Sequence, residues 1–288
     1  MSPSLAPYIN EKTRILEAAG IEQAEAEVEL ILCHVLNVGR MELVLHGAER
    51  LTPDVRDRVD AIIERRVTRY PLQLILGEYW FYGRKFKVSP AVMVPAPETE
   101  LLCEAAVAFV KRQRLASPRI LDIGVGSGVI SITAALEIPG ATLVALDISP
   151  DAIAVAIENA TMLGVRDRFE FRESDLFTAL GNDERFDLIL SNPPYISEGD
   201  YAGLPPEVLA DPKVSLTSGE EGMDHIIEIV KHAPNYLMPG GRIMFEIGYD
   251  QSDKVTRLVT ADSRYSEITV LKDLADIDRV VILACEAQ

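Results

Sequence analysis

The feature that most constrains the fold is a regular alternation of helical and strand-like segments that begins at residue 98. Apolar segments typical of buried strands lie at 119–124, 142–147, 168–172, 186–191 and 242–247. Helical patterns lie at 98–113, 128–137, 150–163, 223–237 and 251–261. This order predicts an α/β fold, a mainly parallel sheet with helices on both faces. The last strands, 265–271 and 279–285, have no helix between them and are expected to pair antiparallel at one edge.

The N-terminal part of the chain, residues 4–70, has a different pattern, with apolar residues at helical spacing throughout. It predicts four short helices, of which the first three end near Gly20, Gly39 and Gly47. Thr52 followed by Pro53 predicts the start of the fourth. Residues 78–94 are aromatic and β-branched, which favours a hairpin that joins a helical domain to an α/β domain.

The charge of the chain is uneven, with a net value of −17 over 288 residues. Residues 1–75 carry 9 basic and 12 acidic side chains, whereas residues 76–288 carry 19 and 33. A protein that binds a phosphate backbone concentrates basic residues, so nucleic acid is a poor default substrate. No apolar run is long enough to span a bilayer, and no secretory signal is visible at the N-terminus. Together with only three cysteines, this predicts a cytoplasmic protein with reduced thiols.

A glycine-rich loop follows the first predicted strand of the sheet and consists of Asp122, Ile123, Gly124, Val125, Gly126, Ser127 and Gly128. Glycines permit a tight turn and the close approach of a ligand to the backbone. An ordinary strand-to-helix turn would explain them as well, but Asp147 ends the next strand, nineteen residues beyond Gly128. An acid at this spacing accepts hydrogen bonds from ribose hydroxyls. The G-x-G-x-G spacing lacks the longer dinucleotide fingerprint, so S-adenosylmethionine is predicted rather than NAD.

A second motif directly follows strand 186–191 and reads Ser191, Asn192, Pro193, Pro194 and Tyr195. Ligands of parallel sheets bind beyond the carboxyl ends of the strands, so Gly124, Asp147 and Asn192 should converge on one crevice. An amide nitrogen is a poor nucleophile because its lone pair is delocalised, and acceptors for its two N–H bonds would position it. The side-chain oxygen of Asn192 and a proline carbonyl can be those acceptors, and Tyr195 can stack on a planar group.

The motif at 192–195 resembles the (D/N/S)-P-P-(Y/F/W) signature of amino-group methyltransferases. The whole chain resembles one branch of these enzymes, the HemK/PrmC family of protein-(glutamine-N5) methyltransferases. The matching segments include LGEYWF at 76–81, VPAPETE at 94–100, LDIGVGSG at 121–128, DIS at 147–149, SD at 174–175, SNPPYI at 191–196, PGG at 239–241, EIG at 246–248 and Gln251. The helical domain and the PETE segment are the family-specific parts of this likeness.

The resemblance implies a Rossmann-like class I methyltransferase sheet in residues 98–288, a helical substrate-recognition domain at 1–72 and a hairpin or linker at 73–97. It implies S-adenosylmethionine-dependent methylation of the glutamine in the GGQ motif of peptide chain release factors, in translation termination. The expected mechanism is direct displacement without a metal. The expected partner is a release factor, bound by a cytoplasmic monomer without nucleic acid or membrane.

The resemblance also assigns site residues. The cofactor would contact Gly124, Val125, Gly126, Ser127, Gly128, Asp147, Ile148, Asp175, Leu176 and Asn192, with Asp175 and Leu176 flanking the adenine. Asp122, at the end of its strand, either caps the glycine turn or reaches the cofactor as well. Asn192, Pro193, Pro194 and Tyr195 would hold the target glutamine, and Phe81, Glu98, Thr99 and Glu100 would frame the same pocket. Two positions depart from the family pattern: Ala96 replaces its usual arginine, and Asp211 replaces the glutamate of a Glu-Pro pair.

Other functions are compatible with parts of the sequence. The same motif serves glutamine methylation of a ribosomal protein or methylation of the adenine amine in nucleic acid, but the latter needs a basic groove that is not evident. A dehydrogenase would need the longer glycine fingerprint, and a non-catalytic module would not need all three motifs. The scattered histidines are interpreted as ordinary surface or core residues, and Cys103 as core packing.

Overall fold

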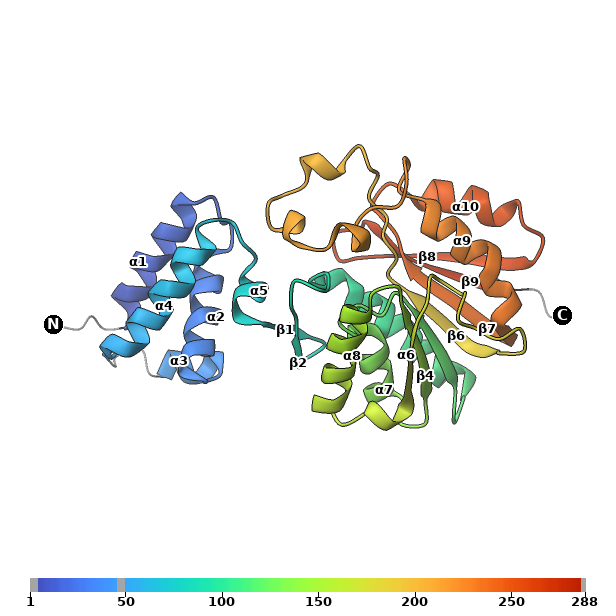
Figure 1. Cartoon of the computed structure of the whole chain (residues 1–288), viewed down its shortest axis with the longest axis horizontal. Helices are drawn as coiled ribbons and strands as arrows, with labels where there is room; N and C mark the ends of the chain where they lie inside the picture. The colour runs from blue at the N-terminus through green and yellow to red at the C-terminus, as the bar shows by residue number, and fades with distance from the viewer. Residues whose placement is uncertain (1–4, 46–49, 286–288) are drawn as a thin grey trace. The chain divides into compact units, whose positions relative to one another are not determined.

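The computed structural model describes residues 5–45 and 50–285, and the chain divides into two compact units. The helical unit comprises Met1–Glu78 and Pro205–Ala210, and the sheet unit comprises Tyr79–Leu204 and Asp211–Gln288. Figure 1 shows the elements of each. The sequence did not indicate that a segment following Tyr195 would belong to the helical unit.

The helical unit contains α1 (Leu5–Ala18), α2 (Ala24–Leu36), α3 (Arg40–Leu45), α4 (Pro53–Arg66) and α5 (Leu72–Leu76). Their apolar faces share one core that includes Leu16, Val28, Ile31 and Ile63. The four predicted helices are present, and α5 was not predicted. The second helix ends at Asn37, which adopts the left-handed conformation at φ 56°, rather than at Gly39. Gly47 lies outside the described residues.

The N-terminus of α4 forms as its sequence predicts. The Thr52 hydroxyl accepts a hydrogen bond from the backbone N–H of Val55 at 3.4 Å, and Pro53 occupies the first turn. The opposite end of α4 carries Arg66, whose side chain is buried in the unit. The helix therefore brings a cation into the interior, where it requires an anionic partner.

The sheet unit is built on seven strands in the order β5-β4-β3-β6-β7-β9-β8. They are β3 (Arg119–Ile123), β4 (Thr142–Asp147), β5 (Phe169–Glu173), β6 (Phe186–Ser191), β7 (Leu237–Glu246), β8 (Tyr265–Lys272) and β9 (Asp278–Cys285). The first five in spatial order are parallel, and β9 runs antiparallel to both of its neighbours. The predicted mainly parallel sheet with an antiparallel pair at one edge is confirmed.

Helices cover both faces of this sheet, as the alternation predicts (Figure 1). They are α6 (Glu100–Gln113), α7 (Val129–Glu137), α8 (Pro150–Met162), α9 (Asp224–His232) and α10 (Ser252–Thr260). Adjacent residues of β3 face opposite ways, so Ile120 joins the core beneath α6, α7 and α8, and Leu121 joins the core beneath α9 and α10. Cys103 is buried in the first of these cores, which confirms its interpretation as a packing residue.

One predicted boundary is wrong. The helix expected at 223–237 ends at His232 and is followed by a 3₁₀ turn at Ala233–Tyr236, after which β7 begins at Leu237 instead of 242. Pro234 lacks the N–H that a continuing α-helix would need, which accounts for the early end. The expected hairpin is present as β1 (Glu78–Phe81) and β2 (Arg84–Lys87), joined by Tyr82 and Gly83 at positive φ.

Within the described residues, none of the helices combines the length and apolar character that a membrane crossing would require.

Candidate active site

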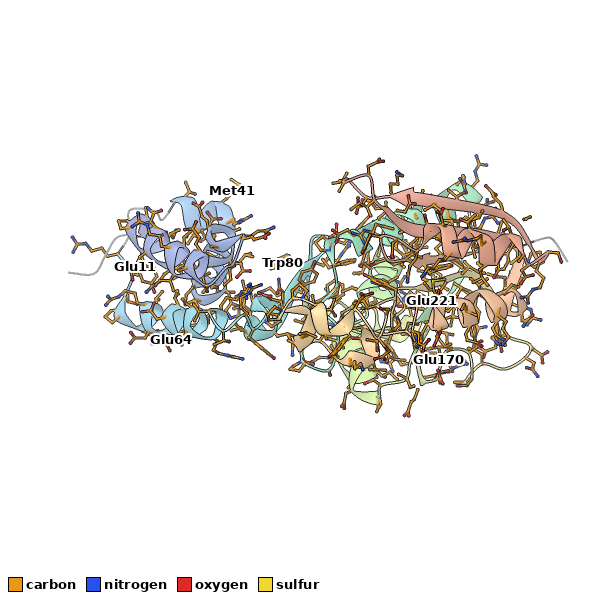
Figure 2. The ribbon with its side chains drawn as sticks, turned by 90° about the horizontal axis from the view of Figure 1, so that it is seen from above. Glu11, Met41, Glu64, Trp80, Glu170 and Glu221 are labelled. Carbon is orange, nitrogen blue, oxygen red and sulfur yellow. The ribbon has the colours of Figure 1, made fainter. Side chains whose placement is uncertain are left out.

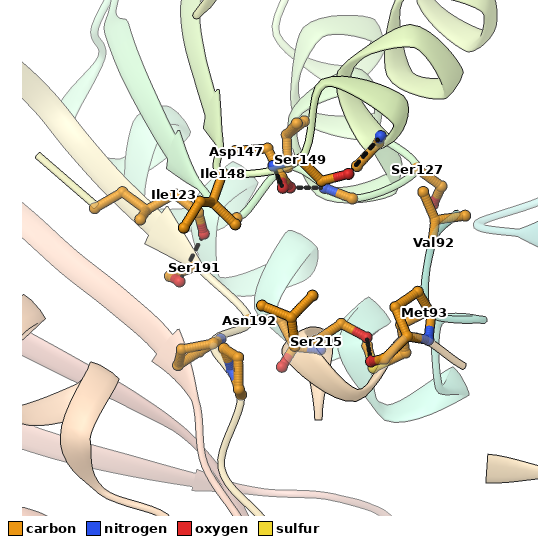
Figure 3. Close-up of a pocket in the computed structure, with 18 of the residues that line it drawn as sticks. Val92, Met93, Ile123, Ser127, Asp147, Ile148, Ser149, Ser191, Asn192 and Ser215 are labelled. Carbon is orange, nitrogen blue, oxygen red and sulfur yellow. Dashed lines mark hydrogen bonds between the residues drawn. The ribbon is translucent and has the colours of Figure 1, made fainter. Parts of the chain in front are cut away.

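A pocket opens in the sheet unit beyond the carboxyl ends of β3, β4 and β6, where a parallel sheet is expected to bind its ligand. Figure 3 shows Asp147, Ile148 and Ser149 on one side of this pocket and Asn192 and Ser215 on the other. The predicted site residues that line it are Thr99, Gly124, Val125, Gly126, Ser127, Asp147, Ile148, Asp175, Leu176, Asn192, Pro193 and Pro194. Three strand ends far apart in the sequence therefore meet at one cavity.

The glycine turn after β3 requires its glycines for backbone conformation. Gly124, Gly126 and Gly128 all have positive φ, between 52° and 84°, where other residues are strained. At Gly128 a Cβ atom would also lie 2.7 Å from the Cδ1 of Ile132. The turn is tied to β4, because the N–H of Gly124 donates to the carbonyl of Leu146 at 2.8 Å.

Asp147 is held rigidly by backbone donors at the end of β4. Its Oδ2 accepts from the N–H of Gly126 at 2.9 Å, and its Oδ1 accepts from the N–H of Ser149 at 2.9 Å. Burial nevertheless raises the pKa of this carboxyl above its usual value. Each carboxylate oxygen can accept more than one hydrogen bond, so Asp147 keeps acceptor capacity for two hydroxyl groups. This arrangement fits the ribose of a nucleoside.

The turn that follows β5 supplies a second wall. Leu176 lines the pocket with φ +48°, a conformation that a leucine rarely adopts. The Ser174 hydroxyl holds the turn by donating to the carbonyl of Leu176 at 2.8 Å and accepting from the N–H of Ala179 at 3.0 Å. Next to Asp147, the side chain of Ile148 is half exposed. Apolar surfaces at Ile148 and Leu176 suit a flat aromatic base between them.

Asn192 presents one end of its amide to the protein and leaves the other without a partner. Its Nδ2 donates to the Thr99 hydroxyl at 3.2 Å. Its Oδ1 is buried, and no group among the described residues donates a hydrogen bond to it. A buried acceptor of this kind costs free energy unless a ligand supplies a donor. The position of Asn192 is set by the preceding residue, because Ser191 donates to the carbonyl of Ile123 at 2.7 Å.

The rest of the motif is anchored away from the cavity. The Gln251 amide donates to the carbonyl of Tyr195 at 2.9 Å, and the Tyr195 hydroxyl donates to Glu246 Oε1 at 3.2 Å. Tyr195 is therefore placed beside the pocket but is not among the residues that line it. Burial, and then the charge of Glu246, raise the pKa of Tyr195 well above its usual value.

Several predicted residues do not line the pocket: Asp122, Gly128, Tyr195, Phe81, Glu98 and Glu100. Phe81 is fully buried and packs edge-on against Phe86 at 6.2 Å between ring centroids. Glu100 accepts from the N–H of Tyr82 at 2.6 Å, a contact that supports the hairpin. Asp122 is fully buried in β3, and burial raises its pKa to about 7.

Sequence reasoning missed other residues of the site. Pro212, Val214 and Ser215 line the pocket from the segment after the Asn-Pro-Pro-Tyr motif, and His225 lines it from α9. Asp211, one of the two departures from the family pattern, accepts from the N–H of Val94 at 3.2 Å, and burial raises its pKa to about 6. The Asp211 carboxyl thus links these two segments. Glu246 belongs to the EIG segment noted in the sequence, but only its contacts reveal a role.

Two of the histidines, His225 and His232, have ordinary hydrogen-bond partners. His225 shares a hydrogen bond with the Ser218 hydroxyl at 2.7 Å, and His232 with Glu228 at 3.1 Å. Over residues 5–45 and 50–285, no group of three or more histidine, cysteine or acidic side chains is arranged to hold a metal ion.

Comparison with known proteins identifies relatives over most of the chain. Residues 8–77 match the family described as the PrmC N-terminal domain, and residues 116–279 match a methyltransferase domain family. A release factor glutamine methyltransferase of Cereibacter sphaeroides is 43% identical over 92% of this chain and 93% of its own length. One from Neisseria gonorrhoeae is 37% identical over 89% and 92%.

Solved structures support the fold. A methyltransferase from Pyrococcus furiosus matches with a TM-score of 0.51 at 16% identity, over 70% of this chain and 89% of that one. At this level of identity, the likeness concerns the fold alone.

Proposed function

Since the chain belongs to the family of release factor glutamine methyltransferases, we propose that it transfers a methyl group from S-adenosylmethionine to the side-chain N5 of the GGQ glutamine in a peptide chain release factor. The two relatives, from Cereibacter sphaeroides and Neisseria gonorrhoeae, are both named release factor glutamine methyltransferase. Neither name refers to a ribosomal protein or a nucleic acid. Glutamine methylation of a ribosomal protein and adenine methylation are therefore not favoured.

The pocket residues offer the acceptors and apolar surfaces that S-adenosylmethionine requires. Asp147 would hold the ribose hydroxyls, the turn Gly124–Gly126–Ser127 would lie against the methionine part, and Ile148 and Leu176 would enclose the adenine beside Asp175. When bound, S-adenosylmethionine supplies an electrophilic methyl group on a sulfonium. The apolar walls exclude water from the place where that positive charge is lost during transfer.

The observation that carries the proposal is the unpartnered Oδ1 of Asn192 in the wall of this pocket. A primary amide brings two N–H donors, and Asn192 Oδ1 can accept one of them. A backbone carbonyl of the adjacent prolines would accept the other. Together these acceptors would orient the nitrogen toward the methyl group, and positioning of this kind supplies much of the rate of a direct transfer. Tyr195, beside the pocket, would limit the space for the amide.

The remaining parts of the proposal concern partners and compartment. We assign substrate selection to the helical unit, because it carries none of the motifs that line the pocket. The site is complete within one sheet unit, which supports a monomer, and the acidic surface of that unit does not favour nucleic acid. Glu170 and Glu221 illustrate this surface in Figure 2. Three free thiols and a substrate from translation support a cytoplasmic enzyme.

Asn192→Ala tests the proposed function most directly. It removes the acceptor while the prolines and the glycine turn remain, so cofactor affinity should stay within several-fold. Single-turnover methyl transfer to a release factor should slow by at least about 100-fold, the cost of losing one positioned polar contact at a reacting centre. Asn192→Asp retains an acceptor oxygen but adds a negative charge, so its methyl-transfer rate should lie between those of the parent and of Asn192→Ala. A parent-like rate in Asn192→Ala would overturn the proposal.

Asp147→Ala tests the cofactor assignment. Calorimetric titration with S-adenosylmethionine should show a loss of about 1–3 kcal/mol, because ribose hydroxyls would be left without their acceptor in a buried site. Asp151→Ala, in the first turn of α8 and outside the pocket lining, is the matched control and should bind normally. Unchanged affinity in Asp147→Ala would remove this residue from the site.

A further inference from the structure

We propose that Thr99 and Glu246 are positioning residues that determine which end of the Asn192 amide faces the pocket, and that they thereby select a substrate nitrogen carrying N–H donors. This inference rests on the proposed function of Asn192. It concerns a chain of hydrogen bonds that begins in the pocket wall and ends at a buried carboxylate on β7.

This chain of side chains is joined by three hydrogen bonds, all within the sheet unit. Asn192 Nδ2 lies 3.2 Å from Thr99 Oγ1, and Thr99 Oγ1 lies 2.7 Å from Glu246 Oε2. The second carboxylate oxygen, Oε1, accepts from the Tyr195 hydroxyl at 3.2 Å. Thr99 and Glu246 are each only 1% exposed, so water does not compete for these bonds.

The direction of the chain follows from the number of protons available. A carboxylate only accepts, so the single hydroxyl hydrogen of Thr99 is donated to Glu246. The Thr99 oxygen can then only accept from Asn192, which requires the NH₂ end of that amide. Asn192 Oδ1 must therefore face away from Thr99, where it is the buried acceptor without a partner. The reversed amide would present NH₂ to the pocket and repel an N–H donor.

The direction of these hydrogen bonds depends on whether Glu246 is ionised. Burial raises its pKa to about 7, while the hydrogen bond from Thr99 opposes the rise. The other ionisable groups that interact with it are Tyr195, Arg279 and Glu98, and its own charge acts on Cys103. A protonated Glu246 can donate to Thr99 instead of accepting from it, which would free the Thr99 hydrogen for Asn192 Oδ1. Methyl transfer should therefore decline as the pH falls through about 7.

The first experiment removes the Thr99 hydroxyl in the full-length enzyme. Thr99→Val keeps the shape of the side chain but removes its hydroxyl and both hydrogen bonds that the hydroxyl makes. The kcat for release factor methylation should fall about 10-fold or more, because the Asn192 amide loses the hydrogen bond that orients it. The KM for the release factor should change little, because the protein surface dominates its binding. Thr99→Ser should restore most of kcat. Thr133→Val, which removes another buried hydroxyl outside the pocket lining, should match the parent.

The second experiment reverses the direction in which the hydrogen bond between Thr99 and residue 246 is donated. Glu246→Gln can donate an N–H to Thr99, so it should lower kcat in the Asn192 background and abolish the decline near pH 7. In an Asn192→Asp background the same change should raise kcat, because Thr99 can then donate its hydrogen to the new carboxylate. Glu98→Gln in that background removes a nearby charge without joining the chain and should not give this rescue.

The outcomes separate the inference from the function on which it rests. A parent-like rate in Asn192→Ala overturns the proposed function itself. If Asn192→Ala is inactive while Thr99→Val matches the parent, the function stands and the positioning role is wrong. A Glu246→Gln effect of the same sign in both Asn192 backgrounds also contradicts the role, because a merely structural defect would not change sign. Reversal of sign with rescue by Thr99→Ser supports it.

Discussion

The helical unit and the sheet unit both contain acidic side chains removed from solvent, partly in the first and fully in the second, but their surroundings act on them in opposite ways. In the helical unit, Arg66 is buried and forms a two-point contact with Glu27, at 2.7 and 3.0 Å, and a third bond to Glu207 at 2.9 Å. In the sheet unit, Asp122 is fully buried without a basic partner, and burial raises its pKa although Ser131 opposes the rise. Arg66 therefore favours the charged form of its two partners, whereas the surroundings of Asp122 favour its neutral form.

This difference gives the two units opposite responses to pH. The Arg69 and Arg66 guanidinium groups lower the pKa of Glu207 to about 2, so its contribution to stability is present above its unfolded pKa and is lost as the pH falls toward 2. Burial raises the pKa of Asp122 to about 7, so its contribution is present below its unfolded pKa and is lost as the pH rises through 7. Acid below about pH 4 should therefore weaken the helical unit, whereas a rise in pH from about 4 to 7 should weaken the sheet unit.

Arg66→Met should have the largest effect on this contrast. It leaves the partly buried Glu27 without its partner, and breaking a buried ion pair from one side costs at most roughly 3–5 kcal/mol. Hydrogen exchange should show the loss of protection in α2 and α4, with the strands of the sheet unit unaffected. Arg69→Met, at a half-exposed site, should cost less. Equal loss of protection in both units would contradict their separate stabilisation.

Asp122→Asn should reduce the response of the sheet unit to rising pH, to which Glu246 and Asp211, whose pKa values are also raised, contribute as well. The parent must ionise a buried carboxyl between about pH 4 and 8, and a shift of about three units corresponds to at most roughly 4 kcal/mol. Denaturant unfolding at a series of pH values should show the variant gaining stability relative to the parent across this range. A difference that does not depend on pH would mean that Asp122 stays in one ionisation state.

Glu207→Gln should produce the smaller, opposite change in the helical unit. Above pH 5 the parent should be more stable by about 2 kcal/mol, because the partly buried carboxylate holds two guanidinium groups. The advantage should shrink as the pH falls toward 2, where the parent carboxyl takes up a proton. Hydrogen exchange of the α4 backbone amides at a series of pH values measures this difference in the free energy of unfolding. An advantage that grows in acid would show that the ion pairs do not stabilise the unit.

The sequence predicted those parts of the site that depend on local pattern. Gly124 and Gly128 adopt a conformation that favours glycine, and Asp147 and Asn192 end strands whose parallel order was evident from the alternation. Their meeting at one pocket follows from the topology of a parallel sheet.

The contacts that orient those residues could not be predicted in the same way. Thr99 and Glu246 lie 147 residues apart, and no spacing rule connects a 3₁₀ turn with the end of a distant strand. Asp122 has the same residue type as Asp147 and also belongs to a strand, yet its side chain is buried away from the pocket. Only the packed structure distinguishes these two aspartates.

The placement of Pro205–Ala210 in the helical unit has a consequence for how the nascent chain folds. Synthesis proceeds from the N-terminus, so Arg66 meets Glu27, 39 positions earlier, as soon as α4 has left the ribosome. Its bond to Glu207 must wait for 141 further residues, by which time β3, β4, β5 and β6 have already been made. The first unit to emerge is thus completed only after half of the second has been translated. Ribosomes stalled before residue 205 should carry a helical unit without its last ion pairs.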